Sequence, residues 1–343
     1  MNKRRLTRRQ AWRVNKIQEE RLRRAERRMA TQPSDEDELT GPERFGRVIA
    51  NFGALLDIED EAGDLHRCAS RQNLGLPVVG DKVVWQASRT GLGVVTALRP
   101  RRSLLARPDA AGMQKPLAAN VDQILVVAAP VPRYDTDLIN QYLVAAEAIG
   151  IRPVIVLNKV DLLDPVSRAR LDVDFAPYTA VGYHLLSAST LEHHGLDRLA
   201  TELRGKTSVF VGQSGVGKSS LVKALIPAAA VRVGELTEAA LGRHTTSAAR
   251  LYRLDGGGAI IDSPGVRAFR LWAMSREQLA HGFPEFRPFL GHCRFRNCRH
   301  EAEPGCALRA AVEEGKASAE RLASFQAIAR DIEERHRPEW ERE

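Results

Sequence analysis

The sequence predicts a multidomain fold in which a small β-barrel precedes an α/β domain, and a small α-helical domain with clustered cysteines follows. Three observations lead to this fold class. Five short β-patterned runs follow one another between residues 46 and 98, and from residue 120 apolar strands alternate with helical patterns, as in a parallel sheet. Three of the four cysteines lie between residues 293 and 306. A chain of 343 residues is long enough for these parts to have separate cores.

The net charge of the chain is confined to its N-terminal arm. There are 51 Lys and Arg residues against 43 Asp and Glu residues, a net charge of +8. Residues 1–28 hold 12 of the basic and three of the acidic residues, which leaves 39 basic and 40 acidic residues in the rest. A basic arm of this kind neutralises phosphates by counterion release, which favours RNA as a partner. The alternative is a solvated tail that only aids solubility.

The sequence also indicates a cytoplasmic protein that does not enter a membrane. No apolar run of signal-peptide length is visible in the arm, and the longest apolar run, residues 124–131, is too short to span a bilayer. Four cysteines without a secretion signal argue against a disulfide framework. No coiled-coil heptads are visible, so we expect a monomer.

A new domain begins near Arg44, after an acidic linker with Pro and Ser residues. The β-patterned runs of this domain are residues 46–52, 54–58, 65–70, 82–87 and 93–98. Five such strands predict a closed barrel like an OB-fold over residues 44–112, a fold that often presents one face to nucleic acid. A barrel that acts only as a spacer or lid fits the pattern equally well, because fold does not fix function.

A phosphate-binding loop follows the short apolar strand at residues 208–211. It matches G-x-x-x-x-G-K-[ST] at every fixed position and leads into a helical pattern at residues 218–226, the context that the motif requires. Its residues are Gly212, Gln213, Ser214, Gly215, Val216, Gly217, Lys218, Ser219 and Ser220. Backbone N–H groups would surround the phosphates, Lys218 would reach the β- and γ-phosphates, and Ser219 would ligate Mg²⁺. The alternative is a Gly-rich turn before a helix.

A base-recognition motif lies before this loop, at the ends of two predicted strands, residues 151–157 and 181–186. The residues that follow these strands are Asn158, Lys159, Val160 and Asp161, and then Ser187 and Ala188. The Asp161 carboxylate can accept hydrogen bonds from guanine N1–H and the 2-amino group, while the Asn158 amide lies near O6 and N7. Adenine presents the opposite pattern on that edge, so we expect GTP and GDP as ligands.

A hairpin pattern at residues 251–261 delivers the remaining phosphate contacts. It ends on Asp262, whose carboxylate is expected near Mg²⁺, and Gly265, whose N–H is expected at the γ-phosphate. Thr245 and Thr246 are the candidates for a hydroxyl that closes on the metal when the γ-phosphate is present. The sequence leaves the choice between them open.

The residue that orients the attacking water is not the usual one. Many GTPases carry a Gln directly after D-x-x-G, but this chain has Val266 there, so intrinsic hydrolysis should be slow. We assign the orienting role to His244, whose imidazole can hydrogen-bond to water. The alternative is an exposed histidine without a chemical role.

A cysteine and histidine cluster follows the spacing C-x₄-C-x-H-x₅-C. Its members are Cys293, Cys298, His300 and Cys306. Three thiolates and one imidazole suit a closed, tetrahedral structural Zn²⁺ site, although free buried cysteines are the alternative. Cys68 stands apart and is expected in the barrel core. Three arginines lie between the ligands and form either a surface for RNA or an ordinary solvated face: Arg294, Arg296 and Arg299.

The order of these motifs is unusual. Ordinary GTPases carry the phosphate loop before the base-recognition motif, whereas here residues 158–161 and Ser187-Ala188 precede it. This order, with the β-rich domain, the Gly-Arg-His-Thr-Thr segment, Asp-Ser-Pro-Gly and the cysteine cluster, resembles the ribosome small subunit-dependent GTPase A family of circularly permuted GTPases. The resemblance covers about residues 44–315.

The resemblance implies an OB-fold, a permuted GTPase domain and a zinc domain that act in late maturation of the small ribosomal subunit. We expect an arm and linker at residues 1–43, the barrel at 44–112, the GTPase domain at 113–272, and a zinc-binding domain with a helical C-terminal tail at 273–343. The predicted protein hydrolyses GTP slowly alone and faster with the subunit and its 16S rRNA. GTP would hold the flanking domains in a subunit-binding arrangement.

Two other classes of function remain open. An RNA-binding scaffold with a structural nucleotide would show no turnover with ribosomes. An ATPase or nucleotide kinase is opposed by Asn158 and Asp161, and no second acceptor site is evident.

Overall fold

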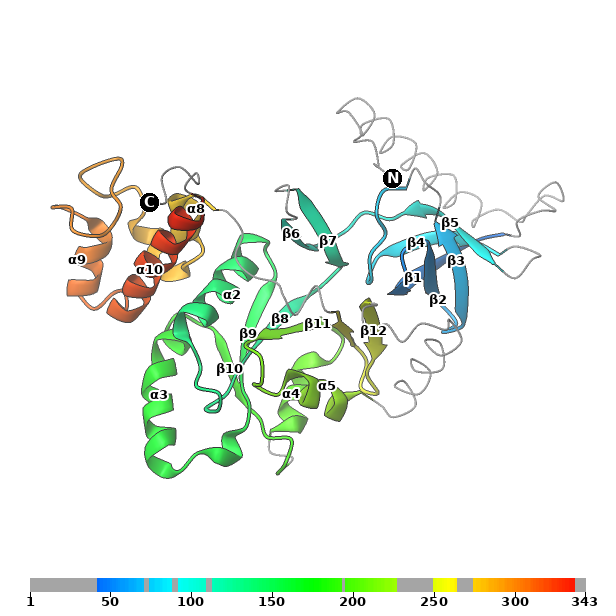
Figure 1. The fold of residues 1–343 in the computed structure, drawn as a ribbon, viewed down its shortest axis with the longest axis horizontal. Helices are drawn as coiled ribbons and strands as arrows, with labels where there is room; N and C mark the ends of the chain where they lie inside the picture. Colours follow the sequence, from blue (N-terminus) through cyan, green and yellow to red (C-terminus); the bar gives the residue numbers. More distant parts are fainter. Residues whose placement is uncertain are drawn as a thin grey trace.

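In the computed structural model the barrel and a C-terminal helical lobe flank a central α/β domain (Figure 1). The structure describes residues 42–70, 74–87, 92–108, 113–192, 195–226, 249–263 and 274–336. We call residues 274–336 the C-terminal lobe. None of the helices in these ranges has both the length and the apolar character needed to cross a membrane.

Five strands form the barrel, and their pairing closes on itself. They are β1 Glu43–Asn51, β2 Leu55–Asp60, β3 Leu65–Ser70, β4 Lys82–Gln86 and β5 Gly93–Leu98. Strand β1 pairs with both β2 and β4, and β3 pairs with β5, so the order β1-β2-β3-β5-β4 returns to β1. Cys68 and Trp85 lie fully buried inside. The predicted barrel and the expected place of Cys68 are therefore confirmed.

A two-stranded hairpin, which the sequence did not predict, connects the barrel to the α/β domain. It consists of β6 Leu104–Pro108 and β7 Gln114–Ala119. Asn120 follows it in a left-handed conformation with φ 55°. Its side chain accepts from the Arg102 N–H (3.0 Å) and donates to the Gly80 carbonyl (2.9 Å), so one buried amide joins hairpin and barrel.

The α/β domain is built on parallel strands in the order β10-β9-β8-β11-β13, and β12 pairs antiparallel with β13. Their bounds are β8 Gln123–Ala128, β9 Arg152–Leu157, β10 His184–Ser187, β11 Thr207–Gly212, β12 Ala249–Arg253 and β13 Ala259–Asp262. Buried runs such as Ile-Leu-Val-Val in β8 suit a sheet that is covered on both faces.

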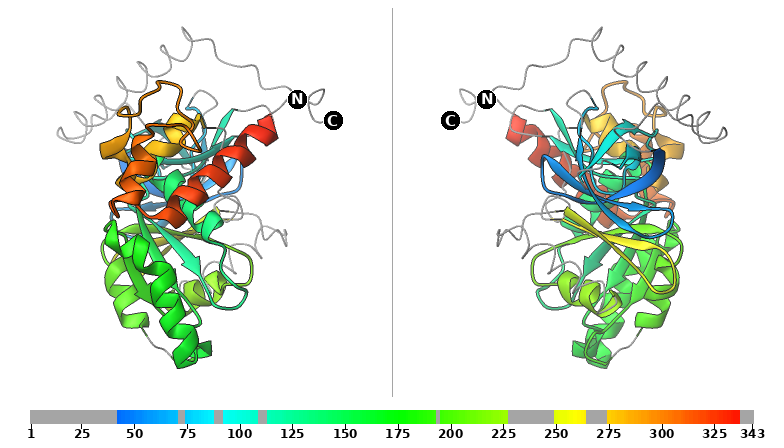
Figure 2. Two further views of the ribbon diagram at one scale, coloured as in Figure 1. Left: turned by 90° about the vertical axis from the view of Figure 1, so that its left-hand side faces the viewer. Right: turned by 90° about the vertical axis from the view of Figure 1, so that its right-hand side faces the viewer.

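Helices cover both faces of this sheet (Figure 2). Helices α2 Thr136–Ala148 and α3 Pro165–Ala180 pack against one face, where Leu143 and Phe175 join the core. Helices α4 Leu196–Leu203 and α5 Lys218–Leu225 pack against the other face. The carboxyl ends of β8, β9, β10, β11 and β13 therefore share one edge, where ligands bind in open α/β sheets.

Barrel and α/β domain share one continuous sheet. Strand β1 pairs antiparallel with β12, with Ala50 opposite Arg250 and Asn51 opposite Ala249. Strand β12 in turn pairs with β13, which ends on Asp262. Backbone hydrogen bonds thus connect the barrel wall to the strand that carries a predicted site residue.

The C-terminal lobe contains α8 Arg276–His281, η2 Pro284–Phe289, α9 Ala307–Glu313 and α10 Ala319–His336. Phe283 and Phe286 stack at 4.8 Å between ring centroids, and Phe325 of α10 meets both rings edge-on at 5.9 Å. The sequence suggested only a helical tail beyond about residue 319. Helix α10 is instead part of the hydrophobic core of the lobe.

A buried arginine joins the lobe to the α/β domain. Arg321 of α10 is 2% exposed, forms an ion pair with Glu285, and donates to the Asn140 side chain of α2 at 2.8 Å. Its guanidinium also lies over the rings of Tyr178, Tyr183 and Phe283. Glu285 belongs to the same lobe and neutralises the Arg321 guanidinium, which reaches Asn140 of the α/β domain, so loss of either charge would leave its partner buried and unpaired.

We predict that Arg321→Ala loosens this junction. The change leaves Glu285 buried without its partner, which costs roughly 3–5 kcal/mol of local stability. Hydrogen exchange followed by mass spectrometry should show faster exchange in peptides of α10 and α2. Arg330→Ala, an exposed change on the same helix, is the control and should alter local stability by less than about 0.5 kcal/mol. Unchanged protection in Arg321→Ala would contradict the assigned role of the pair.

Candidate functional site

The phosphate-loop motif lies between β11 and α5, as predicted. Every residue of β11 is buried, so the loop leaves a rigid strand at the carboxyl edge of the sheet. Gly212 and Gly217 take positive φ values of 138° and 93°. A Cβ atom at Gly212 would lie 2.2 Å from the Val127 carbonyl oxygen, so the first glycine is required for β11 to pass β8 at this point.

Lys218 crosses back over the loop. Its Nζ donates to the carbonyl oxygens of Gly212 (2.8 Å) and Gln213 (2.6 Å). The ammonium group is thus held over the mouth of the loop, where a phosphate group would meet it. Ser219 and Ser220 in the first turn of α5 are exposed, so their hydroxyls are accessible to a ligand.

Asn158 brings the base-recognition motif to the phosphate loop. It follows β9, is 1% exposed, and its Nδ2 donates to the Val216 carbonyl oxygen at 2.8 Å. A Cβ atom at Gly217 would lie 2.3 Å from that same Nδ2. The Asn158 Oδ1 is buried, and within the described ranges it has no hydrogen-bond partner. An unpaired buried acceptor costs free energy, so this oxygen needs a donor that the described residues do not supply.

Lys159 adds a second connection, through a segment that the sequence analysis missed. Its backbone is left-handed, and its Nζ donates to the carbonyl oxygens of Val131 (2.8 Å) and Gly215 (2.7 Å). Val131 follows β8 in the Pro-Val-Pro run, and Pro132 lies beside Gly215. The Pro-Val-Pro run directly after an apolar strand was the signal that could have identified a turn beside the phosphate loop.

Asp161 and the end of β10 complete the base-recognition side of the site. Asp161 is half-buried in the short helix η1 Val160–Leu162. The Val160 N–H donates to the Ala188 carbonyl oxygen (3.3 Å), which places the residues after β9 and β10 side by side. Ser189 is fully buried, and its hydroxyl accepts from the N–H groups of Leu191 and Glu192. It therefore shapes the turn after Ser187-Ala188.

Asp262 is the last residue of β13, which is the neighbour of β11 in the sheet. It therefore reaches the same edge as the phosphate loop. The other predicted catalytic residues, His244, Thr245, Thr246 and Gly265, lie outside the described residues, as does Val266.

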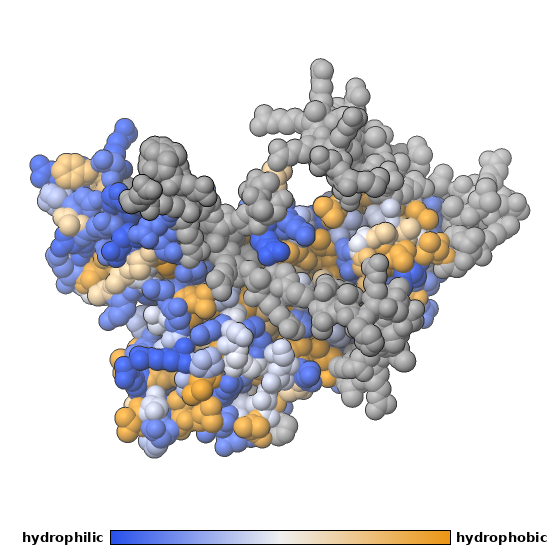
Figure 3. All heavy atoms as spheres, in the orientation of Figure 1, coloured by the Kyte–Doolittle hydropathy of each residue, from blue (hydrophilic) through white to orange (hydrophobic). Residues whose placement is uncertain are grey.

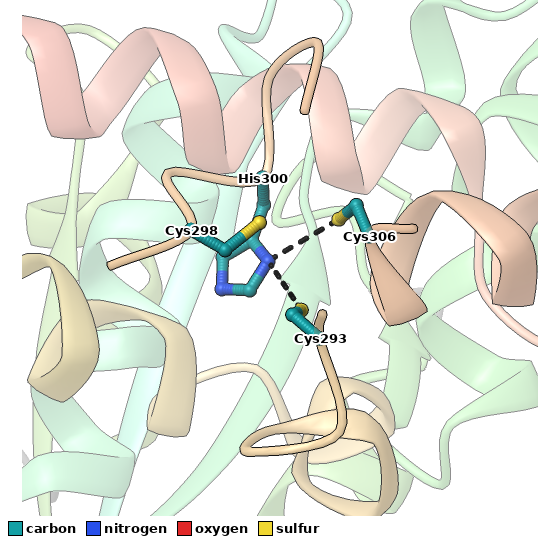
Figure 4. Close-up of side chains that lie close together, drawn as sticks. All are labelled: Cys293, Cys298, His300 and Cys306. Atoms are coloured by element: carbon teal, nitrogen blue, oxygen red, sulfur yellow. Dashed lines mark hydrogen bonds between the residues drawn. The ribbon is translucent and has the colours of Figure 1, made fainter. Parts of the chain in front are cut away.

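The four predicted metal ligands converge in the C-terminal lobe (Figure 4). Their ligand atoms all lie within 4.8 Å of one another. His300 Nδ1 is 3.5 Å from Cys293 Sγ and 3.4 Å from Cys306 Sγ, and His300 takes a left-handed φ of 60° that turns its ring inward. Such a closed set of three sulfurs and one nitrogen can hold a metal ion.

Burial keeps this cluster neutral when no metal ion is bound. Burial raises the pKa of the Cys298 thiol to about 12 and lowers the pKa of His300. Without a cation, these groups would remain neutral and crowd one another in a partly dry site. A divalent ion would deprotonate the thiols that bind it and would neutralise most of the charge of the resulting thiolates.

Comparisons with known proteins agree with this geometry. The family model described as RsgA GTPase matches residues 98–272. The small ribosomal subunit biogenesis GTPase RsgA of Pseudomonas aeruginosa is 50% identical over 337 residues, which span 97% of this chain and 99% of that protein.

Two solved structures share the fold. YjeQ from Thermotoga maritima superimposes with a TM-score of 0.70 at 31% identity, covering 84% of this chain and 98% of that one. YloQ, described as a circularly permuted GTPase, gives a TM-score of 0.68 at 28% identity, covering 90% of this chain and 100% of that one. The permuted fold predicted from the motif order is confirmed.

We predict that Gly217→Ala weakens guanine-nucleotide binding by at least tenfold, or about 1.4 kcal/mol. The new Cβ would collide with Asn158 Nδ2 and separate the two motifs. Isothermal titration with GDP measures the effect. Gly182→Ala is the matched control, because Gly182 has the same φ of 93° but no atom within 4 Å of an added Cβ. Equal GDP affinity in both variants would contradict the role of this close approach.

We also predict one equivalent of tightly bound metal per chain. Elemental analysis of protein purified without chelator should find it, and Cys298→Ser should reduce it because an alcohol is a poor replacement for a thiolate ligand. Cys68→Ala, which changes the fourth cysteine in the barrel core, should keep the metal. Metal-free wild-type protein with a folded lobe would refute the assignment.

Proposed function

Since this chain belongs to the RsgA GTPase family, we propose that it hydrolyses GTP to GDP and phosphate while it assists late maturation of the small ribosomal subunit. The observation that carries the proposal is the hydrogen bond from Asn158 to Val216, at 2.8 Å. It joins a guanine-type motif to a phosphate loop at one edge of the sheet. A single guanosine nucleotide can therefore contact both.

In this proposal the nucleotide is selected at its base. The Asp161 carboxylate accepts from N1–H and the 2-amino group, Asn158 meets the O6 and N7 side, and the stem of Lys159 lies along the ring. Adenine offers an acceptor where Asp161 needs a donor, so ATP would leave buried polar groups unpaired. This selection separates the proposal from an ATPase or nucleotide kinase.

The phosphates and Mg²⁺ would be held by the loop and its neighbours. The β- and γ-phosphates would be bound by backbone N–H groups of residues 213–218 and by the Lys218 ammonium. Mg²⁺ would be bound or oriented by the Ser219 hydroxyl and Asp262. Mg²⁺ neutralises charge on the phosphates when it is bound. Thr245 or Thr246, together with the Gly265 N–H, would close on the γ-phosphate side.

Water is oriented by His244 in this scheme. Val266 cannot hydrogen-bond to water, so turnover by the isolated protein is slow and depends on how the segment containing His244 is placed. That segment runs directly into β12, which pairs with barrel strand β1. Contact of the barrel with ribosomal RNA would therefore affect the position of the catalytic segment through the paired strands β1 and β12.

We assign zinc to the cysteine and histidine cluster. Tetrahedral zinc, with Zn–S bonds of about 2.3 Å and Zn–N bonds of about 2.0 Å, separates its sulfur and nitrogen ligands by roughly 3.5 Å. The sulfur–nitrogen distances of 3.4 and 3.5 Å agree with this value. With all four positions taken by protein, the ion would be structural.

The remaining assignments come from the sequence and from the resemblance to the family. We propose that the protein acts in the cytoplasm as a monomer, with the arm at residues 1–43, the barrel at 44–112, the GTPase domain at 113–272 and the zinc domain at 273–343. The basic arm and the barrel would contact 16S rRNA, and GTP would hold the flanking domains in the arrangement that binds the subunit.

The proposal is tested by GTP hydrolysis with and without purified small subunits. We predict strong stimulation of the wild type by subunits and a loss of at least tenfold in that stimulation for His244→Ala, with GTP affinity within about twofold, because the change removes a group that acts on water alone. His281→Ala, at an exposed histidine of α8, is the control. A hundredfold excess of ATP should not compete.

Two outcomes would contradict these assignments. Absence of turnover with subunits would favour an RNA-binding scaffold with a structural nucleotide. Retained stimulation in His244→Ala would exclude the histidine while leaving the GTPase assignment intact.

A further inference from the structure

The loop between the first two metal ligands is an exposed, basic and aromatic tetrapeptide. Its residues, Arg294, Phe295, Arg296 and Asn297, are all exposed, and Phe295 is 42% exposed. Phe295 is the only phenylalanine among the exposed large hydrophobic residues of the described ranges. The face of the lobe seen in Figure 3 is mostly hydrophilic, and an exposed ring between two arginines offers a surface on which a base can stack.

The tetrapeptide is held in place at both ends. Cys293 and Cys298 belong to the metal cluster. The Arg294 N–H donates to the Gly305 carbonyl oxygen (3.0 Å), and the Cys298 N–H donates to the Phe295 carbonyl oxygen (3.3 Å). The loop is therefore ordered before a ligand contacts Phe295, so binding costs little conformational entropy of the loop. This favours binding even though the contact area is small.

The two arginines beside Phe295 differ from the arginines that pair with carboxylates around the metal cluster. Arg276 and Arg299 both pair with Glu333. In contrast, no carboxylate of the described residues forms an ion pair with Arg294 or Arg296. Arg294 lies over the Phe295 ring, with Cζ 5.5 Å from the centroid. The loop therefore presents one aromatic ring between two positive charges that the protein leaves unneutralised.

We propose that Phe295 stacks on an unpaired RNA base while Arg294 and Arg296 bind the adjacent phosphates. Stacking on a side chain needs a splayed, single-stranded base, whereas the arginines need a polyanion; single-stranded RNA offers both together. A protein partner could pack against the ring, but it would also have to supply carboxylates for the two guanidinium groups. The inference rests on the proposed function only for the source of the RNA, which is the small subunit.

The test is fluorescence anisotropy of the full-length, metal-loaded protein with a labelled twelve-nucleotide poly(A) RNA and with a blunt RNA duplex. Measurement at about 300 mM KCl weakens contacts made by the basic arm, which is the same in every variant. We expect Phe295→Ala to weaken poly(A) binding about tenfold and duplex binding by less than twofold. Phe295→Trp should retain affinity, and Phe295→Leu should not.

The arginines give an independent measurement. Arg294→Gln with Arg296→Gln should lower the slope of log K against log salt by about 0.7 for each phosphate contact that is lost. Phe295→Ala should leave that slope unchanged. The controls are Val173→Ala and Arg168→Gln, which change exposed residues of α3, and bound metal is measured for every variant.

The outcomes separate this inference from the proposed function. Equal poly(A) affinity of wild type and Phe295→Ala overturns the inference, even if subunits stimulate GTP hydrolysis. It is also overturned if Phe295→Ala weakens small-subunit binding but no RNA binding, since a ribosomal protein would then be the partner. Absence of subunit-stimulated hydrolysis in the wild type would instead refute the proposed function, whatever the RNA result.

Discussion

The hydrogen bond between Asn158 and the Val216 carbonyl oxygen connects two motifs that lie 58 residues apart in the chain. The order of the strands explains how this is possible. Asn158 follows β9 and Val216 follows β11, and β8 lies between these strands in the sheet. Lys159 also bonds to Val131, directly beyond β8, so the ends of three adjacent strands are tied by two consecutive side chains. In a parallel sheet the edge, not the sequence order, determines which residues meet, so permutation leaves the site intact.

Permutation changes what is attached to this edge. Helix α2 begins shortly after the Val131 segment that Lys159 holds, and its Asn140 bonds to Arg321 of the C-terminal lobe. On the opposite side, β12 pairs with the barrel and β13 carries Asp262. Both flanking domains are thus attached to elements that border the phosphate loop. The contacts are backbone pairing on one side and, on the other, the hydrogen bond from the buried Arg321 guanidinium to Asn140.

Local patterns predicted most of the fold and the site because each pattern has a local cause. Alternating apolar residues marked the barrel strands, and the fixed spacing of glycines with Lys218 marked the phosphate loop. The β6–β7 hairpin was missed since Pro108 and Pro116 both oppose a strand assignment, and the pairing accommodates them with a shifted register after Leu105. Contacts such as Lys159 with Val131 depend on tertiary placement, which no local pattern contains.

Helix α10 shows a different reason for an incomplete prediction. Its apolar residues Leu322, Phe325 and Ile328 recur at helical spacing, but the charge of the segment led to its interpretation as a tail. Arg321 directly beside them was not predictable as a buried residue, because arginine is rarely buried without a partner. Its partners, Glu285 and Asn140, come from distant parts of the chain.

The charge proposed for the metal centre is compatible with the arginines that gather around it. With a divalent ion bound, three thiolates would give the centre a net charge of −1, so it would attract cations rather than repel them. The neighbouring Glu301 and Glu333 are held by Arg276 and Arg299, which keeps these carboxylates engaged with cations. Arg294 and Arg296 take no part in these ion pairs and are exposed to solvent. The lobe can therefore present positive charge to a polyanion without weakening the site that holds its loop in place.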